Sequence, residues 1–75
     1  MEIDNKSIDL HGISHERAEI LVEDFFYLHE PPFEVITGHS TVMQNIVLNI
    51  CEQFEYDCFH RNSNNLGSLI IIKGF

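Results

Sequence analysis

Apolar residues along this chain follow two spacings, one typical of strands and one typical of helices. Residues 7–10, 33–36 and 56–60 predict three strands, and the unbroken apolar run 69–72 predicts a fourth in the middle of a sheet. Between them, apolar residues recur every three or four positions, which predicts two amphipathic helices. Their apolar stripes are Ala18, Leu21, Val22, Phe25 and Leu28 in the first helix, and Met43, Ile46, Val47, Ile50 and Phe54 in the second.

Polar residues and prolines mark where these elements begin and end. Ser14 is a good N-cap for the first helix, and Ser40 or Thr41 for the second, because their hydroxyls accept from free N–H groups of the first turn. The prolines at 31–32 end the first helix by removing N–H donors. Residues 62–65 are rich in Asn and Ser and predict a turn. The predicted element order is βαβαββ.

This order predicts an α/β (α+β) two-layer sandwich with a mixed four-stranded sheet and two helices on one face. Strands joined by a crossover helix run parallel, so strands one to three are expected to be parallel and the fourth to return antiparallel. The other face of the sheet is then partly open. Two of the four residues 69–72 are expected to point there and form an apolar patch that a protein partner or a second copy of the chain could cover.

Composition and charge narrow the class of protein. The chain has 75 residues, of which 44% are hydrophobic, which suits a single small globular domain over residues 7–75 after an N-terminal extension, residues 1–6. No apolar run is long enough to cross a membrane and no leader pattern is present, so a cytoplasmic protein is expected, with Cys51 and Cys58 as reduced, buried thiols. The formal net charge of −8 excludes a large basic face for duplex nucleic acid.

Candidate chemistry gathers in the turns that follow the strands. Residues 9–12, 37–40 and 61–65 all follow strands expected to be parallel, so they should meet at one edge of the sheet, where α/β proteins bind ligands. Both helices begin there, and a helix N-terminus attracts anions through free N–H groups and a partial positive charge. The second helix has no acidic residue in its first turn, so a site for one phosphate is expected.

These residues resemble the small MutS-related (Smr) domain family. The family's L-D-L-H-G motif is matched at residues 8–12, and its H-G-x-G or T-G-x-G motif is matched at residues 37–40, with Ser40 in place of the last glycine. A polar, glycine-containing turn at residues 64–67 and an apolar closing strand at residues 68–73 complete the pattern, so the resemblance covers residues 7–75. It implies a fold like the C-terminal domain of translation initiation factor 3. It also implies binding of DNA or RNA and, in many members, endonuclease activity that cleaves phosphodiester bonds.

Carried over by position, the resemblance assigns roles to individual residues. Asp9 and His11 match the candidates for catalysis, since imidazole transfers protons near neutral pH and a carboxylate can hold it or bind a divalent ion. Gly12, Thr37 and Gly38 match residues that shape the backbone around the substrate. His39 is a candidate phosphate contact, and the turn that continues through Ser40 and Thr41 would hold the phosphate.

Other interpretations of the same residues stay open. Asp9 can be a structural acceptor for the N–H groups of its turn, and His39 an exposed residue near a cap. A divalent metal ion held by Asp9, His11 and His39 is conceivable, although the spacing does not establish one. The remaining histidines (His15, His29 and His60) are interpreted as surface or edge residues. The whole chain can also be a non-catalytic module that binds a protein or nucleotide, or an adaptor whose acidic first helix mimics nucleic acid.

Overall fold

A computed structural model describes residues 7–62 and 65–74; the predicted N-terminal extension, residues 1–6, lies outside the described residues. The element order is βαβαββ, as the sequence predicts. The elements are β1 (Ser7–Asp9), α1 (His15–Leu28), β2 (Phe33–Ile36), α2 (Thr41–Phe54), β3 (Tyr56–Asn62) and β4 (Asn65–Lys73). No helix within these described ranges is long and apolar enough to cross a membrane.

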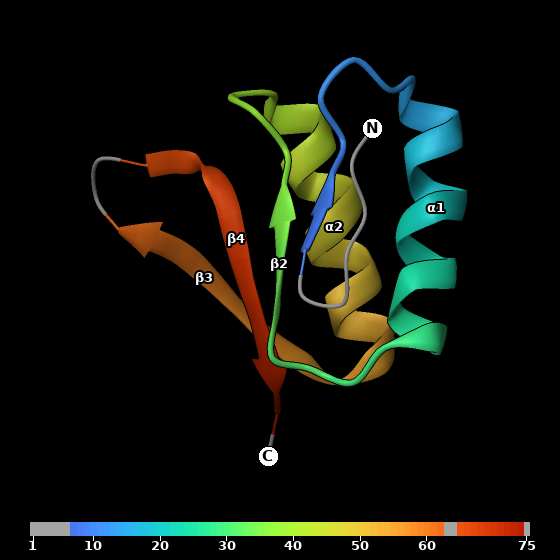
Figure 1. Ribbon diagram of the computed structural model, residues 1–75, viewed down its shortest axis with the longest axis vertical. Helices are drawn as coiled ribbons and strands as arrows, with labels where there is room; N and C mark the ends of the chain where they lie inside the picture. The colour runs from blue at the N-terminus through green and yellow to red at the C-terminus, as the bar shows by residue number, and fades with distance from the viewer. Residues whose placement is uncertain (1–6, 63–64, 75) are drawn as a thin grey trace.

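The four strands form one mixed sheet in the order β1-β2-β4-β3 (Figure 1). β1 and β2 are parallel, and β4 is antiparallel to both β2 and β3, so β3 runs in the direction of β2. These directions confirm the prediction from the crossover helices. The position of β4 between β2 and β3 confirms that the unbroken apolar run lies in the interior of the sheet.

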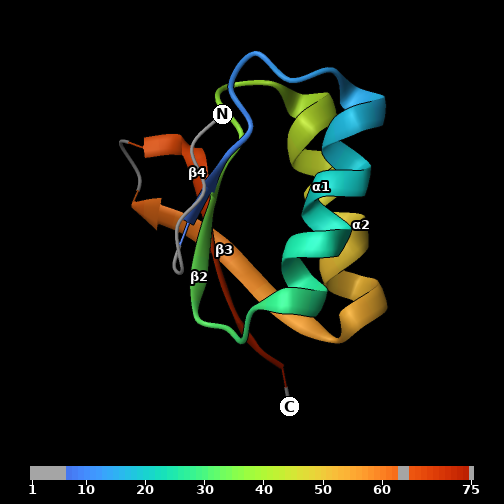
Figure 2. The ribbon, with the colours of Figure 1, turned by 45° about the vertical axis from the view of Figure 1, so that its right-hand side comes forward.

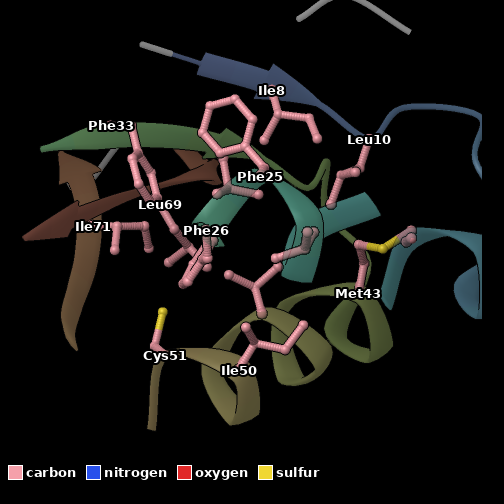
Figure 3. Packing of buried hydrophobic residues seen from close by; sticks show 14 residues of the cluster. Ile8, Leu10, Phe25, Phe26, Phe33, Met43, Ile50, Cys51, Leu69 and Ile71 are labelled. Atoms are coloured by element: carbon pink, nitrogen blue, oxygen red, sulfur yellow. The ribbon is translucent and has the colours of Figure 1, made fainter. Parts of the chain in front are cut away.

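Both helices pack on the same face of the sheet, which confirms the two-layer sandwich (Figure 2). The core lies between the two layers and receives side chains from every element (Figure 3). Its buried residues are Ile8, Leu10, Ala18, Val22, Phe25, Phe26, Phe33, Val35, Met43, Val47, Ile50, Cys51, Leu69 and Ile71. Aromatic rings fill the end of this core away from the helix N-termini, where Phe26 contacts Phe33 with ring centroids 4.9 Å apart.

The buried stripe of α1 differs from the prediction at its C-terminal end. Leu28 was expected in the core but is 77% exposed, and Phe26 is buried in its place. Phe26 follows Ala18 and Val22 at intervals of four residues, so it continues their face of the helix, whereas Leu28 lies off that face. The larger aromatic ring therefore fills the space beside Phe33, and Leu28 faces away from the sheet.

The hairpin between β3 and β4 is longer than predicted. β3 extends to Asn62 and β4 starts at Asn65, and these two residues are paired, so they belong to strands and not to the predicted turn. An irregularity in register falls between His60 and Asn62. Residues 63–64, also assigned to that turn, lie outside the described residues.

The face of the sheet opposite the helices carries apolar side chains. Ile70 and Ile72 alternate with the buried Leu69 and Ile71 and are half-buried, which confirms that two of these four residues point to the open face. Phe59, the cross-strand partner of Ile70, is 49% exposed on the same face. Phe59, Ile70 and Ile72 therefore give the open face an apolar area, beside Asp57, which is the cross-strand partner of Ile72.

Candidate functional site

Two turns, which follow β1 and β2, lie together at one edge of the sheet, next to residues 66–67 near the start of β4. We call this edge the rim and define it by residues 9–14, 37–41 and 66–67; its two turns lie at the top of Figure 1. The N–H of Leu10 donates to the carbonyl of Ile36 at 2.8 Å, which joins the first turn to the second. The N–H groups of Thr37 and Gly38 both donate to the carbonyl of Gly67, at 2.8 and 3.0 Å, which joins the second turn to β4.

The first turn presents His11 to solvent. Ile13 N–H donates to the Leu10 carbonyl at 3.0 Å, which closes a four-residue turn. Gly12 has φ +78°, as the third residue of a type II turn requires, so a glycine is favoured there. The carboxylate of Asp9 accepts from the backbone N–H of His11 at 2.9 Å. Asp9 therefore fixes the backbone that carries the exposed His11 side chain. This is the alternative that the sequence left open for Asp9, a structural acceptor for an N–H group of its turn.

The second turn is held from inside the protein by Thr37. This residue is 4% exposed, and its hydroxyl donates to the carbonyls of Gly38 and Gly67, at 2.9 and 3.3 Å. Gly38 has φ +68°, so the turn also requires a residue that tolerates a left-handed backbone. Thr37 thus positions the turn, while the exposed His39 is the side chain that the turn presents to solvent.

Two residues that hold the rim together, Gln44 and Gly67, were not predicted as site residues from the sequence. Gln44 donates through Nε2 to the carbonyls of Leu66 and Gly38, at 2.8 and 3.3 Å. Gly67 lies so close to the second turn that a Cβ built on it would be 3.3 Å from both Cα and C of Gly38. The sequence signal that could have identified Gly67 is its place in the polar turn of the family pattern. Gln44 follows the buried Met43 on α2, and no sequence pattern distinguished it.

Both helices begin at the rim, and each is capped by a serine. Ser14 accepts from the N–H of Arg17 at 3.3 Å, and Ser40 accepts from the N–H of Met43 at 3.1 Å. Ser40 is therefore the N-cap of α2, and Thr41 is its exposed first residue. The first turn of α2 contains no acidic residue, so the helix's partial positive charge of about half a unit is not cancelled by its own side chains.

Charged side chains at the rim are few. Arg17 is exposed in the first turn of α1, beside the loop that carries His11, and Glu16 in the same turn has the opposite sign. Lys73 lies at the far end of β4 and forms a salt bridge with Glu30 at 3.0 Å. Among the described side chains, Arg17 is thus the permanent cation nearest to the rim, and the helix N-terminus supplies the other positive field.

The remaining histidines separate into two groups. His15 is exposed at the start of α1, and His60 is exposed near the end of β3. His29 lies at the opposite end of α1, half-buried, with its ring centroid 4.3 Å from that of Phe25. The sequence interpretation as surface or edge residues therefore fits His15 and His60, whereas His29 packs against the core.

The rim is an open surface. The part of the chain that the structure describes contains no pocket and no group of three His, Cys, Asp or Glu side chains placed to hold a metal ion. No protein-family model, curated protein or solved structure matches this chain. The rim exposes two imidazoles and a helix N-terminus, and the adjoining first turn of α1 exposes one guanidinium and one carboxylate, so an open surface is available to a flat or extended ligand with an anionic group.

Proposed function

We propose that this chain is an Smr-like domain that binds nucleic acid at the rim and cleaves its phosphodiester bonds. The observation that carries the proposal is the placement of His11 and His39 on two adjacent turns, next to the N-termini of both helices. A phosphate binds favourably at a helix N-terminus, and imidazoles transfer protons near neutral pH. The rim supplies both groups at one edge of the sheet.

Binding is expected to involve few phosphates. The net charge is −8, and among the described side chains Arg17, in the adjoining first turn of α1, is the permanent cation nearest to the rim. The logarithm of affinity for duplex DNA falls with the logarithm of salt concentration by about 0.9 for each phosphate neutralised. Two contacts, one at the start of α2 and one at Arg17, would give a slope of about −2. A slope steeper than about −4 would contradict this binding surface.

His11 is the residue proposed to move the proton. Its imidazole can accept a proton from the attacking water or give one to the leaving oxygen, and its exposure lets substrate approach. Asp9 acts as a positioning residue, because its carboxylate holds the His11 backbone. His39 and the turn at residues 37–41 would contact the phosphate, with Thr37 and Ser40 acting through the backbone that they fix.

Cleavage assays on a supercoiled plasmid and on a labelled RNA hairpin test this proposal, with magnesium ions or with a chelator. His11→Ala should lower the cleavage rate by about 100-fold or more, which is what loss of a general acid or base costs. His29→Gln is the matched control, since it removes a histidine from the opposite end of α1. Equal cleavage by wild type and His11→Ala would overturn the assignment. The chelator arm decides whether a divalent ion takes part.

Two substitutions at Asp9 separate support of the turn from carboxylate chemistry. Asp9→Asn keeps an oxygen that can accept from the His11 N–H, whereas Asp9→Ala removes that acceptor. If Asp9 acts as a positioning residue, Asp9→Asn should keep most of the activity and Asp9→Ala should lose it. Equal loss in both variants would show that the charge itself is required and would reject the positioning role.

The apolar open face favours a second candidate, a non-catalytic interaction module. Phe59 and Leu66 are 49% and 46% exposed, and the acidic chain has few groups to hold nucleic acid. Such a module would bind a protein partner or a second copy of itself through this face. Light scattering of wild type and Phe59→Ser tests the second copy. A dimer that Phe59→Ser dissociates, together with no cleavage of either substrate, would favour this candidate over the nuclease.

A further inference from the structure

Two thiols from different layers of the fold lie together near the end of α2. Cys51 is 2% exposed in the last turns of α2, where Figure 3 shows it at the margin of the core. Cys58 is half-buried on β3, opposite Ile71 of β4, and packs against the same core. Glu55 caps α2 in a left-handed conformation with φ 60°, so the chain turns directly from the helix into β3. Both side chains face the same core, one from the helix layer and one from the sheet. A hydrogen bond between them is the largest cause of the opposite shifts in the pKa of Cys51 and the pKa of Cys58.

We propose that Cys51 and Cys58 are a reactive thiol pair that a low-molecular-weight disulfide oxidises to an intramolecular disulfide. The Cys58 thiolate attacks one sulfur of the small disulfide, forms a mixed disulfide and releases one thiolate of the reagent. Cys51 then gives up its proton and attacks Sγ of Cys58, which releases the second reagent thiol. Two protein thiols are oxidised in total, and one molecule of reagent disulfide is reduced to two thiols.

The surroundings of the two thiols assign these roles. Cys58 is the more accessible of the two, so it meets the reagent first. The hydrogen bond from Cys51 lowers the pKa of Cys58, against smaller opposing effects of burial and of the Asp57 carboxylate. The same hydrogen bond raises the pKa of Cys51, and burial raises it further. Cys58 is therefore the attacking thiolate, and Cys51 stays protonated until the mixed disulfide brings a target beside it.

The pair is separate from the rim. Cys51 lies at the C-terminal end of α2, whereas the rim lies at its N-terminal end. Oxidation would tie the last turns of α2 to β3 and close a short loop through Glu55. The proposal therefore stands or fails independently of any activity on nucleic acid.

Reaction of the reduced protein with oxidised glutathione, followed by intact mass and peptide mapping, tests the proposal. Wild type should lose two hydrogen atoms, retain no glutathionyl group and give a disulfide-linked peptide pair containing Cys51 and Cys58. Cys51→Ala should accumulate one glutathionyl group on Cys58, because no second thiol can displace it. Cys58→Ser should stay unmodified while folded, because Cys51 is buried.

Two outcomes would overturn the proposal. One is a stable glutathionyl adduct on wild type without the linked peptide pair. The other is a folded Cys58→Ser that reacts as fast as Cys51→Ala. Circular dichroism of each variant establishes that it is folded. Peptide mapping of wild type shows whether the disulfide between Cys51 and Cys58 forms, even if Cys51→Ala does not fold.

Discussion

Replacing Gly67 by alanine tests how the second turn of the rim is held against β4. A Cβ at this position would lie 3.3 Å from Cα and C of Gly38 and 3.5 Å from its carbonyl oxygen. These atoms are backbone and cannot rotate away as a side chain would. Gly38 is also fixed by its N–H bond to the Gly67 carbonyl and by the bond from Gln44 to its own carbonyl. The methyl group must therefore displace the turn or strain it.

The expected cost is that of inserting one methyl group into a well-packed site, about 1–3 kcal/mol of the free energy of unfolding. Movement of Gly38 by a few tenths of an ångström would also lengthen the two bonds to the Gly67 carbonyl, which are 2.8 and 3.0 Å long. For a domain of this size, each kcal/mol lowers the melting temperature by roughly 4–8 °C.

Urea denaturation of wild type, Gly67→Ala and Leu66→Ala measures this cost. Leu66 is the matched control because it is the neighbouring residue, is 46% exposed, and binds Gln44 only through its backbone carbonyl. Gly67→Ala should lower the midpoint at an unchanged slope, and Leu66→Ala should stay within about 0.5 kcal/mol of wild type. Amide hydrogen exchange should quicken at Thr37 and Gly38 in Gly67→Ala. A Gly67→Ala protein as stable as Leu66→Ala would refute the close contact between turn and strand.

Three further predictions concern the α2 cap, the buried threonine and the thiol pair. Ser40→Ala should cost about 1 kcal/mol in urea denaturation, because the Met43 N–H loses its acceptor; no loss would contradict the cap. Thr37→Val should lower the free energy of unfolding by about 0.5–1.5 kcal/mol in the same assay, because it removes one hydroxyl hydrogen bond while the carbonyl of Gly67 keeps its two N–H donors. A loss above about 3 kcal/mol would show that Thr37 contributes more than this hydrogen bond. Alkylation of Cys58 by iodoacetamide should have a pH midpoint below the ordinary value of 9.0, because a lowered pKa keeps the thiolate at lower pH. Cys51→Ala should raise that midpoint, and an unchanged midpoint would exclude the hydrogen bond as its cause.

Local patterns in the sequence predict the elements and their order. The spacing of apolar residues places both helices, and the hydroxyls of Ser14 and Ser40 cap them as expected. The crossover rule gives the strand directions, and the apolar run 69–72 gives the interior position of β4. The same rule brings residues 9–12 and 37–40 to one edge of the sheet, so the candidate site is predictable as far as the location of its turns. These features depend on residues close together in the sequence or on general rules of chain connection.

Contacts between distant segments were decided only by the tertiary structure. Thr37 and Gly67 are 30 residues apart, and their hydrogen bond depends on how far β4 extends past β2. The exchange of Leu28 for Phe26 in the core depends on the space left beside Phe33. The placement of Cys51 and Cys58 against the same core depends on the left-handed turn at Glu55 and on the packing of α2 over β3.

The turn at residues 9–12 shows which features the sequence predicts and which only the folded structure decides. Its composition predicts a turn after a strand that carries an acid and a histidine, and the structure places that turn there with His11 exposed. Whether the Asp9 carboxylate contacts an imidazole or a backbone N–H depends on side-chain torsions within the folded turn, and here it contacts the backbone. A sequence pattern specifies which groups are near one another, whereas the packed fold selects which of their possible hydrogen bonds is made.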